Sequence, residues 1–418
     1  MTSHALESVA MLVAEGKGIL AADETVPTLT KRFDALGIRS TEESRRTYRE
    51  MLFTAPGAAE FISGVIMYDE TIRQKSASGT PLAEALTARG ILPGIKVDTG
   101  AKPFAGSPSE TVTEGLDSLR DRLGDYRGMG ARFAKWRAVI HVTDALPSAA
   151  CVSANAHALA RYASLCQEQG LVPIVEPEVL MDGSHTIERC EEVTDFVLHA
   201  VFHALFEQGV ALEGILLKPN MVIAGKGCTH PASVEEVATT TCACLRRHVP
   251  AAVPGIVFLS GGQHARLATA HLNAINQLPT PKPWKVSFSY GRALQDPALE
   301  AWHGRDENIS AGQQAFYHRA RLNGAASVGK YMDEMEAALP TCPRSRVGGG
   351  GKKWLPRGSA PRRRTTFDLR AANVKVWAIR YKQAAYSLSR RHSERTNITL
   401  TAKRSPTCAA DESVGPHK

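Results

Sequence analysis

Residues 214–220 read GILLKPN, a short apolar run that ends on a lysine. The run has the length and composition of a buried β-strand. An ammonium group is costly to remove from water unless it is paired or neutralised, so Lys218 is either a surface lysine or a lysine in a special environment. The rest of the sequence has to decide between these two interpretations.

Seven further apolar runs alternate with segments of helical periodicity, such as residues 155–170 and 190–209. They are GILAAD (18–23), FISGVIMYD (61–69), GIKVD (94–98), ARFAKWRAVI (131–140), LVPIVEPEVL (171–180), PGIVFLSGG (254–262) and KVSFSYGR (285–292). Eight strands that alternate with helices predict an α/β fold of the (β/α)8 or TIM-barrel type. A doubly wound open sheet is the alternative, but no GxGxxG motif opens a helix after the first run.

Charge is distributed unevenly along the chain. Residues 341–418 hold 18 basic and 4 acidic side chains, whereas residues 1–340 hold 32 and 38. We therefore predict a barrel domain over residues 1–340 and a basic, mostly disordered tail over residues 341–418. The tail could bind nucleic acid or an acidic membrane, or be a solubilising extension with no partner; neither partner is expected for the barrel.

The composition excludes several classes of protein. With 43% hydrophobic and 22% charged residues, the chain is neither disordered nor fibrous overall. It has no run of 18 apolar residues and no secretory signal at its start, so we expect a cytoplasmic protein. The eight cysteines include no CxxC pair, which indicates neither a disulfide framework nor a metal site.

Charged and hydroxyl side chains recur where the apolar runs end. In a TIM barrel the carboxyl ends of the strands meet at one face, and active sites lie there. The residues at these positions are Asp23, Lys96, Glu176, Glu178, Lys218, Ser260 and Ser289, which leads to Arg292; the fourth run carries Lys135 and Arg137 within it. Side chains two apart on a strand share a face, so Lys135 with Arg137, and Glu176 with Glu178, project together. Any one of these residues could be an ordinary surface residue, but their recurrence predicts a shared site.

Such a site is suited to carbonyl chemistry. A lysine near other cations and away from water has a lowered pKa and can attack a carbonyl carbon to form a Schiff base. Lys218 has the most apolar flanks and is the predicted nucleophile. Loss of water from the carbinolamine needs a proton donor, and Glu176, with the like charge of Glu178 beside it, fits that role.

The sequence also indicates two anion sites. LSGGQ (259–263) and SYGR (289–292) are glycine-containing strand ends whose backbone N–H groups could hold a phosphate, with Arg292 as a clamp. Lys96, Arg32 and the ADETVPT turn (22–28) could hold a second anion. Glycines after strands are also ordinary turn residues, so each motif alone is not specific.

From about Gly16 to Lys330 the chain resembles class I fructose-1,6-bisphosphate aldolases, most of all those of bacteria. The motifs, in the family order, are GKGILAADE, ISGVIMYDETIRQ, GIKVDTGAKP, RFAKWRAVI, PIVEPEVLMDG, LLKPNMV, FLSGGQ and SFSYGRALQ. The resemblance implies a TIM barrel, no metal or other cofactor, and a homotetramer. It also implies reversible cleavage of fructose 1,6-bisphosphate into dihydroxyacetone phosphate and glyceraldehyde 3-phosphate, in glycolysis and gluconeogenesis.

The resemblance further implies a role for each residue. Lys218 resembles the Schiff-base lysine, Glu176 the general acid and base, and Asp23 the group that takes the C4 hydroxyl proton. Lys135 is expected to assist carbinolamine chemistry, supported by Arg137 and Glu178. The residues that match the ketone-end phosphate site are Ser260, Gly261, Gly291 and Arg292. Those that match the other phosphate site are Thr25, Thr28, Lys96, Arg32 and Arg46.

Two departures from the family pattern stand out. Pro27 in TVPT removes an N–H donor and the freedom of a glycine, which predicts weaker binding of the far phosphate. The chain also ends in GPHK and has no terminal tyrosine, which in many eukaryotic members helps to exchange the enamine proton. The route of enamine protonation is therefore left open.

Two rival functions remain at this level. A metal-dependent aldolase would need a histidine cluster, and His199 with His203 has the i, i+4 spacing for one, although their apolar neighbours favour an ordinary helix face. A non-catalytic scaffold could act through the basic tail alone. The combination of Asp23, Lys135, Glu176 and Lys218 argues against a scaffold, which has no need of buried charges.

Overall fold

The structure, a computed structural model, describes residues 3–337. Each of the eight apolar runs overlaps one parallel strand of a closed barrel, in the order β1-β10-β9-β8-β7-β6-β3-β2. The strands are β1 (Gly18–Ala22), β2 (Ile62–Met67), β3 (Leu92–Lys96), β6 (Phe133–Ile140), β7 (Val172–Val179), β8 (Leu216–Leu217), β9 (Gly255–Phe258) and β10 (Lys285–Tyr290). The (β/α)8 prediction is confirmed, and the open-sheet alternative is wrong.

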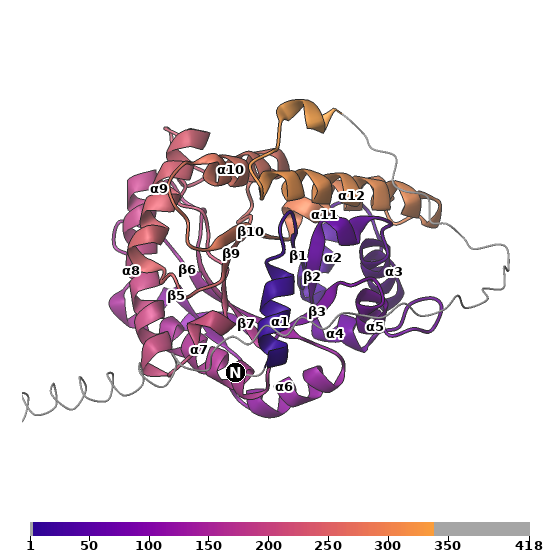
Figure 1. Cartoon of the computed structure of the whole chain (residues 1–418), viewed down its shortest axis with the longest axis horizontal. Helices are drawn as coiled ribbons and strands as arrows, with labels where there is room; N and C mark the ends of the chain where they lie inside the picture. The colour runs from indigo at the N-terminus through magenta and orange to yellow at the C-terminus, as the bar shows by residue number, and fades with distance from the viewer. Residues whose placement is uncertain (1–2, 338–418) are drawn as a thin grey trace, which may run out of the picture. The chain divides into compact units, whose positions relative to one another are not determined.

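Helices surround this barrel (Figure 1). They are α1 (Ser3–Leu12), α2 (Val26–Asp34), α3 (Glu42–Phe53), α4 (Asp69–Arg73), α5 (Leu82–Thr87), α6 (Leu119–Gly128), α7 (Ala149–Glu168), α8 (Ile187–Glu207), α9 (Val234–His248), α10 (Ala265–Gln277), α11 (Arg292–Trp302) and α12 (Ile309–Ala326). Hydroxyl N-caps begin several of them: Ser148, for example, accepts from the Cys151 N–H at the start of α7. Within residues 3–337 no helix is long and apolar enough to cross a membrane.

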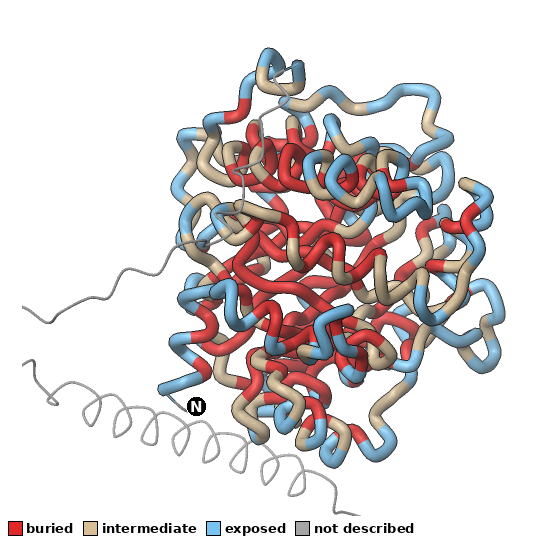
Figure 2. The backbone as a smooth tube through the Cα atoms, turned by 90° about the vertical axis from the view of Figure 1, so that its right-hand side faces the viewer, coloured by how far each residue is buried: buried red, intermediate tan, exposed pale blue. Residues whose placement is uncertain are grey.

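The N-terminal end of the barrel interior is closed by α1. Ala5, Val9 and Leu12 of this helix share one apolar cluster with inward-facing strand residues, among them Phe133 and Val257. In Figure 1 the helix crosses in front of the strands, and Figure 2 shows buried backbone concentrated in the middle of the domain. Since this end is filled with apolar side chains, polar chemistry is confined to the opposite, C-terminal end of the strands.

A two-stranded antiparallel hairpin lies outside the barrel sheet. It consists of β4 (Gly100–Phe104) and β5 (Ser107–Glu114), which follow β3. Thr111 and Thr113 donate hydrogen bonds from their hydroxyls to the carbonyl groups of Val139 and Arg137, at 2.9 and 2.8 Å. The hairpin thus supports the end of β6. It is absent from the eight predicted runs because its residues are mostly polar.

The predicted domain boundary near residue 340 and the basic tail over residues 341–418 lie outside the described residues.

Candidate active site

A cavity of about 600 Å³ opens at the C-terminal ends of the barrel strands. Every predicted site residue except Arg46 lines it: Asp23, Thr25, Thr28, Arg32, Lys96, Lys135, Arg137, Glu176, Glu178, Lys218, Ser260, Gly261, Gly291 and Arg292. These residues come from seven of the eight strands or from the segments that follow them. The structure therefore brings together what the sequence distributes over about 270 residues.

Strand pairing places the central charges at successive levels of the barrel. In the parallel pair β6 and β7, Arg137 lies opposite Glu176, and in the pair β3 and β6, Lys96 lies opposite Lys135. Lys135 and Arg137 both line the cavity, as the alternation of side chains along a strand requires. The same holds for Glu176 and Glu178.

Lys218 is held at its position by the residues around it. Its backbone N–H donates to the carbonyl of Val175 at 2.8 Å, which extends the pairing of the short strand β8 with β7. Pro219 has no N–H, so the backbone hydrogen bonding to β7 stops after Lys218. The side chain of Asn220 then makes the next contact with β7: its Oδ1 accepts from the Val179 N–H at 3.0 Å. The LKPN sequence thus ends the strand while keeping the lysine fixed against β7.

Four side chains form a continuous series of ion pairs at the base of the cavity. Nζ of Lys135 lies 2.6 Å from Oδ2 of Asp23 and 3.2 Å from Oε2 of Glu176. The other carboxylate oxygen of Glu176 lies 3.0 Å from Nζ of Lys218. Lys135, Glu176 and Lys218 are each only 3% exposed. The interpretation of Lys218 as a surface lysine is therefore wrong.

This series fixes the charge of two of its members. Burial alone would raise the pKa of Asp23, but the charge of Lys135, followed by that of Lys218, holds it well below its usual range. Burial would likewise lower the pKa of Lys135, but Asp23 and Glu176 raise it well above its usual value. Asp23 is thus a carboxylate and Lys135 an ammonium ion at neutral pH.

The surroundings of Lys218 differ in one respect from those expected. The sequence suggested a lysine among cations, with Glu176 set beside the like charge of Glu178. In the structure Lys218 contacts a carboxylate directly, and Glu178 is neutralised by an ion pair with Arg137. Glu176 therefore lies between two lysines, in contact with the proposed nucleophile and with Lys135.

Several residues of the cavity are missing from the sequence prediction. Asp98 accepts from Nζ of Lys96 at 2.6 Å through its carboxylate and again through its carbonyl. Glu24 pairs with Arg32, and Lys31 lines the cavity without an ion pair within residues 3–337. Asp98 ends the run GIKVD and Glu24 follows Asp23. Their positions at strand ends could therefore have been used to predict that both line the site.

The loops after β9 and β10 carry the residues predicted for the ketone-end phosphate. Gly261 and Gly262 have φ angles of 58° and 90°, which favour glycine, and their N–H groups donate no hydrogen bond within residues 3–337. Arg292 is the first residue of α11 and has no ion pair in the described part of the chain. Ser289 adds a buried hydroxyl that lines the same cavity and has no partner among the described residues.

The opposite side of the cavity begins at the N-terminus of α2. Thr25 is the N-cap residue; its hydroxyl accepts from the Thr28 N–H and lies 3.0 Å from the Thr28 hydroxyl. Pro27 is the second residue of this helix, so one of the N–H groups that would point at an anion is missing. Arg32 is shared between Glu24 and Asp296, whose carboxylate lies 2.8 Å from Nη2.

Arg46 does not line this cavity. It lies on α3 and forms ion pairs with Glu43, at 2.7 Å, and with Glu50. Both partners lie on the same helix, three and four residues away, which is the spacing of neighbours on a helix face. The expectation that Arg46 contacts the far phosphate is therefore not supported by its position.

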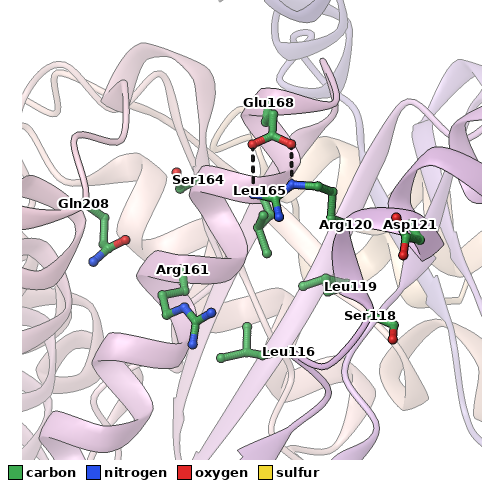
Figure 3. A pocket seen from close by; sticks show the side chains of 10 residues that line it. All are labelled: Leu116, Ser118, Leu119, Arg120, Asp121, Arg161, Ser164, Leu165, Glu168 and Gln208. Carbon is green, nitrogen blue, oxygen red and sulfur yellow. Dashed lines mark hydrogen bonds and ion pairs between the residues drawn. The ribbon is translucent and has the colours of Figure 1, made fainter.

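A second cavity, of about 340 Å³, lies between α6 and α7 (Figure 3). Arg120 and Glu168 form an ion pair across it at 2.7 Å, and Arg161 and Gln208 add polar groups. None of its ten lining residues is a lysine, so it offers no amine for carbonyl chemistry. The barrel mouth is the better candidate for the active site.

The two histidines considered as metal ligands lie on α8. The ring of His199 lies 6.3 Å from that of His248, and His203 pairs with Glu207 at 3.3 Å. Within residues 3–337 no group of three or more potential ligands gathers around them.

Comparison with known proteins places these observations in a family. A family model described as glycolytic, fructose-bisphosphate aldolase class I, matches residues 5–341. A probable fructose-bisphosphate aldolase class 1 from Xanthomonas axonopodis pv. citri is 58% identical over 326 residues, which are 78% of this chain and 97% of that protein. The cytosolic fructose-bisphosphate aldolase 4 of Arabidopsis thaliana is 50% identical over 335 residues, or 80% of this chain and 85% of the relative.

A solved structure gives the same result. Fructose-bisphosphate aldolase from Plasmodium falciparum, crystallised with TRAP and a small-molecule inhibitor, aligns with a TM-score of 0.77 and 47% identity. The alignment covers 79% of this chain and 95% of that one. The chain therefore belongs to the class I fructose-bisphosphate aldolase family.

Proposed function

We propose that Lys218 is the nucleophile with which this aldolase cleaves fructose 1,6-bisphosphate. The observation that carries the proposal is the contact of Lys218 with Glu176 at 3.0 Å, at the base of a cavity whose two sides hold separate anion-binding groups. A buried amine beside a carboxylate has both the nucleophile and the proton carrier that imine formation requires.

The proposed reaction begins when Lys218 passes a proton to Glu176, whose carboxylate lies 3.0 Å away, and the neutral amine then attacks the C2 carbonyl of the open-chain sugar. The carbinolamine that forms loses its hydroxyl as water after protonation by Glu176, which leaves an iminium ion. The iminium accepts the electron pair of the C3–C4 bond as that bond breaks. Asp23 takes the C4 hydroxyl proton, so glyceraldehyde 3-phosphate leaves as an aldehyde and an enamine remains.

The second half of the reaction releases the other product. Protonation of the enamine at C3 regenerates the iminium, and attack of water at C2 gives dihydroxyacetone phosphate and free Lys218. Lys135 keeps Asp23 ionised and its charge favours the transient anionic oxygens. Arg137 and Glu178, paired with each other, support Glu176 from the neighbouring positions.

We propose that the two phosphates occupy opposite sides of the cavity. The N–H groups of Gly261 and Gly291, the Ser260 hydroxyl and Arg292 suit the ketone-end phosphate. Thr25, Thr28, Lys96 and Arg32 suit the other one. Because Arg32 and Lys96 are already paired with carboxylates, the ketone end is the stronger anion site.

Reduction by borohydride tests the central assignment. The full-length enzyme is incubated with fructose 1,6-bisphosphate, treated with borohydride, digested and analysed by mass spectrometry. We expect a stable adduct on Lys218. An adduct on Lys135 or Lys96 instead would overturn the assignment, since only the residue that forms the iminium is trapped.

We further propose that the reaction needs no metal, in keeping with the class I family. Full activity after dialysis against a strong chelator is the expected result, and loss of activity that returns with Zn²⁺ would contradict it. A bacterial type of sequence, a cytoplasmic location and a homotetramer are also part of the proposal. Nothing in the described residues favours a non-catalytic scaffold.

A further inference from the structure

Lys226 lies next to the proposed ketone-end phosphate site, although it is outside the sequence motifs discussed above. It belongs to the segment between β8 and α9. The proposed phosphate residues come from the segments after β9 and β10. A third loop therefore approaches the same point of the barrel mouth.

The loop that carries Lys226 is fixed by backbone contacts with the loop after β7. The N–H groups of Gly225, Lys226 and Gly227 donate to the carbonyls of His185, Met181 and Gly183, each at 2.8 Å. A Cβ atom at Gly225 would lie 2.5 Å from the carbonyl oxygen of Gly183, so only glycine permits this approach. The position of Lys226 is thus set by two loops and not by a free chain.

The cationic groups of Lys226 and Arg292 meet at Gly262. A Cβ atom built on Gly262 would lie 2.8 Å from Nη2 of Arg292 and 3.1 Å from Nζ of Lys226. The two cations are therefore no more than 5.9 Å apart, which is the sum of these two distances. They flank a residue whose N–H donates no hydrogen bond within residues 3–337.

One carboxylate offsets this concentration of positive charge. Nζ of Lys226 donates to Oδ1 of Asp182 at 2.9 Å, and the two side chains are 43% and 65% exposed. The hydrogen bond from Lys226, with the charge of Arg292 in addition, holds the pKa of Asp182 below its usual range. An exposed pair of this kind is weak, so a better anion can replace the carboxylate at little cost.

We propose that Lys226 is a further phosphate-binding residue at the ketone end of the substrate, and that Asp182 holds it ready beside Gly262. A phosphate ester carries about −1.5 to −2 charges at neutral pH and so attracts both cations more strongly than one carboxylate does. The inference rests on the proposed function, because it requires the ketone-end phosphate to bind at Gly261 and Arg292.

Steady-state kinetics of the full-length Lys226→Met variant test this inference. Fructose 1,6-bisphosphate and fructose 1-phosphate both carry the ketone-end phosphate. For both substrates we expect KM to rise about 5- to 20-fold and kcat to stay within about twofold, because binding is lost equally in the ground state and the transition state. Lys226→Arg keeps the charge and should restore most of the affinity.

Lys285→Met is the matched control. Lys285 is exposed at the first residue of β10, at the opposite end of the barrel, and its removal changes the net charge by the same amount. If this variant raises KM as much as Lys226→Met does, the effect is general electrostatic attraction and the inference is wrong.

Asp182→Asn separates phosphate binding from a merely structural ion pair. If Lys226 binds phosphate, removing its competing carboxylate lowers KM about two- to threefold. If the pair only braces the two loops, Asp182→Asn raises KM as Lys226→Met does, which would overturn the inference.

The borohydride experiment keeps the two proposals apart. An adduct on Lys218 together with an unchanged KM in Lys226→Met would refute the role of Lys226 alone. An adduct elsewhere would refute the proposed function, whatever the KM values are.

Discussion

Replacing Lys135 with methionine should destabilise the protein more than any exposed lysine would. Lys135 is buried and contacts two carboxylates, those of Asp23 and Glu176. Methionine fills a similar volume but leaves Asp23 without its ion-pair partner. The free energy of unfolding therefore reports the electrostatic part of the site directly.

The size of the effect follows from the contacts. Removing one partner of a buried ion pair typically costs about 3–5 kcal/mol. Here Glu176 keeps Lys218 at 3.0 Å, and the side chain of Asp23 retains 13% exposure, so part of the loss is compensated. We expect Lys135→Met to lower the unfolding free energy by about 2–4 kcal/mol at pH 7.

A double-mutant cycle with Asp23→Asn isolates the pair. Urea unfolding is measured for the wild type, both single variants and the double variant, at one fixed protein concentration. The double variant should be more stable than the sum of the two single losses predicts, by about 1–3 kcal/mol, because neither partner is then left charged and alone. Lys285→Met serves as the exposed control, with an expected change below about 0.5 kcal/mol.

The pH dependence of this coupling has a defined sign. The pKa of folded Asp23 lies below the usual 3.8, so its contribution is present above pH 3.8 and is lost as the pH falls through the folded value. The pKa of Lys135 is raised above 10.5, so its contribution is present below pH 10.5 and is lost as the pH rises through the folded value. The coupling energy should therefore be constant between about pH 5 and pH 9.

Two results would refute this reasoning. A Lys135→Met variant as stable as Lys285→Met would mean that the buried pair contributes nothing. A coupling energy that falls between about pH 7 and pH 5 would mean that burial, and not Lys135, controls the pKa of Asp23.

Three further predictions concern binding and packing. Pro27→Gly returns an N–H donor to the N-terminus of α2 and should lower KM for fructose 1,6-bisphosphate about two- to fivefold, while KM for fructose 1-phosphate stays unchanged. Equal KM values for variant and wild type would contradict the idea that the missing N–H of Pro27 weakens binding of the far phosphate. Arg46→Met should leave both KM values within about twofold, because Arg46 pairs within its own helix; a larger rise would return Arg46 to the phosphate site. Gly94→Ala should lower the free energy of unfolding, measured with urea, by about 1–3 kcal/mol, because the added Cβ would lie 2.2 Å from Cζ of Phe133. If that contact is the cause, adding Phe133→Leu to the same chain should recover part of the lost stability.

The sequence predicted correctly those features that depend on one local property of the chain, such as the apolar stretch of a buried strand. Each apolar run, from GILAAD to KVSFSYGR, overlaps a barrel strand, because a strand buried on both faces needs a continuous apolar stretch. The strand-end position of Lys218 also followed from its own run. The β4–β5 hairpin was missed because its mostly polar residues lack that signal.

Contacts between strands could not be read in this way. Glu176 was expected beside a like charge, yet it lies between Lys135 and Lys218, while Glu178 pairs with Arg137. Arg46 was assigned to the site by resemblance to the family, yet it does not line the cavity and pairs with Glu43 and Glu50 of its own helix. Both differences arise because ion pairing depends on which side chains meet in space, not on their spacing along the chain.

The sequence by itself therefore determined the barrel, the family and most of the charged residues at its mouth. These follow from periodicity and from the position of a residue on its own strand, which are local properties. Only the tertiary structure decided which cation neutralises which carboxylate, and that Lys226 reaches Gly262 beside Arg292. Those contacts join different strands and the loops that follow them, and their geometry is set by the closure of the barrel.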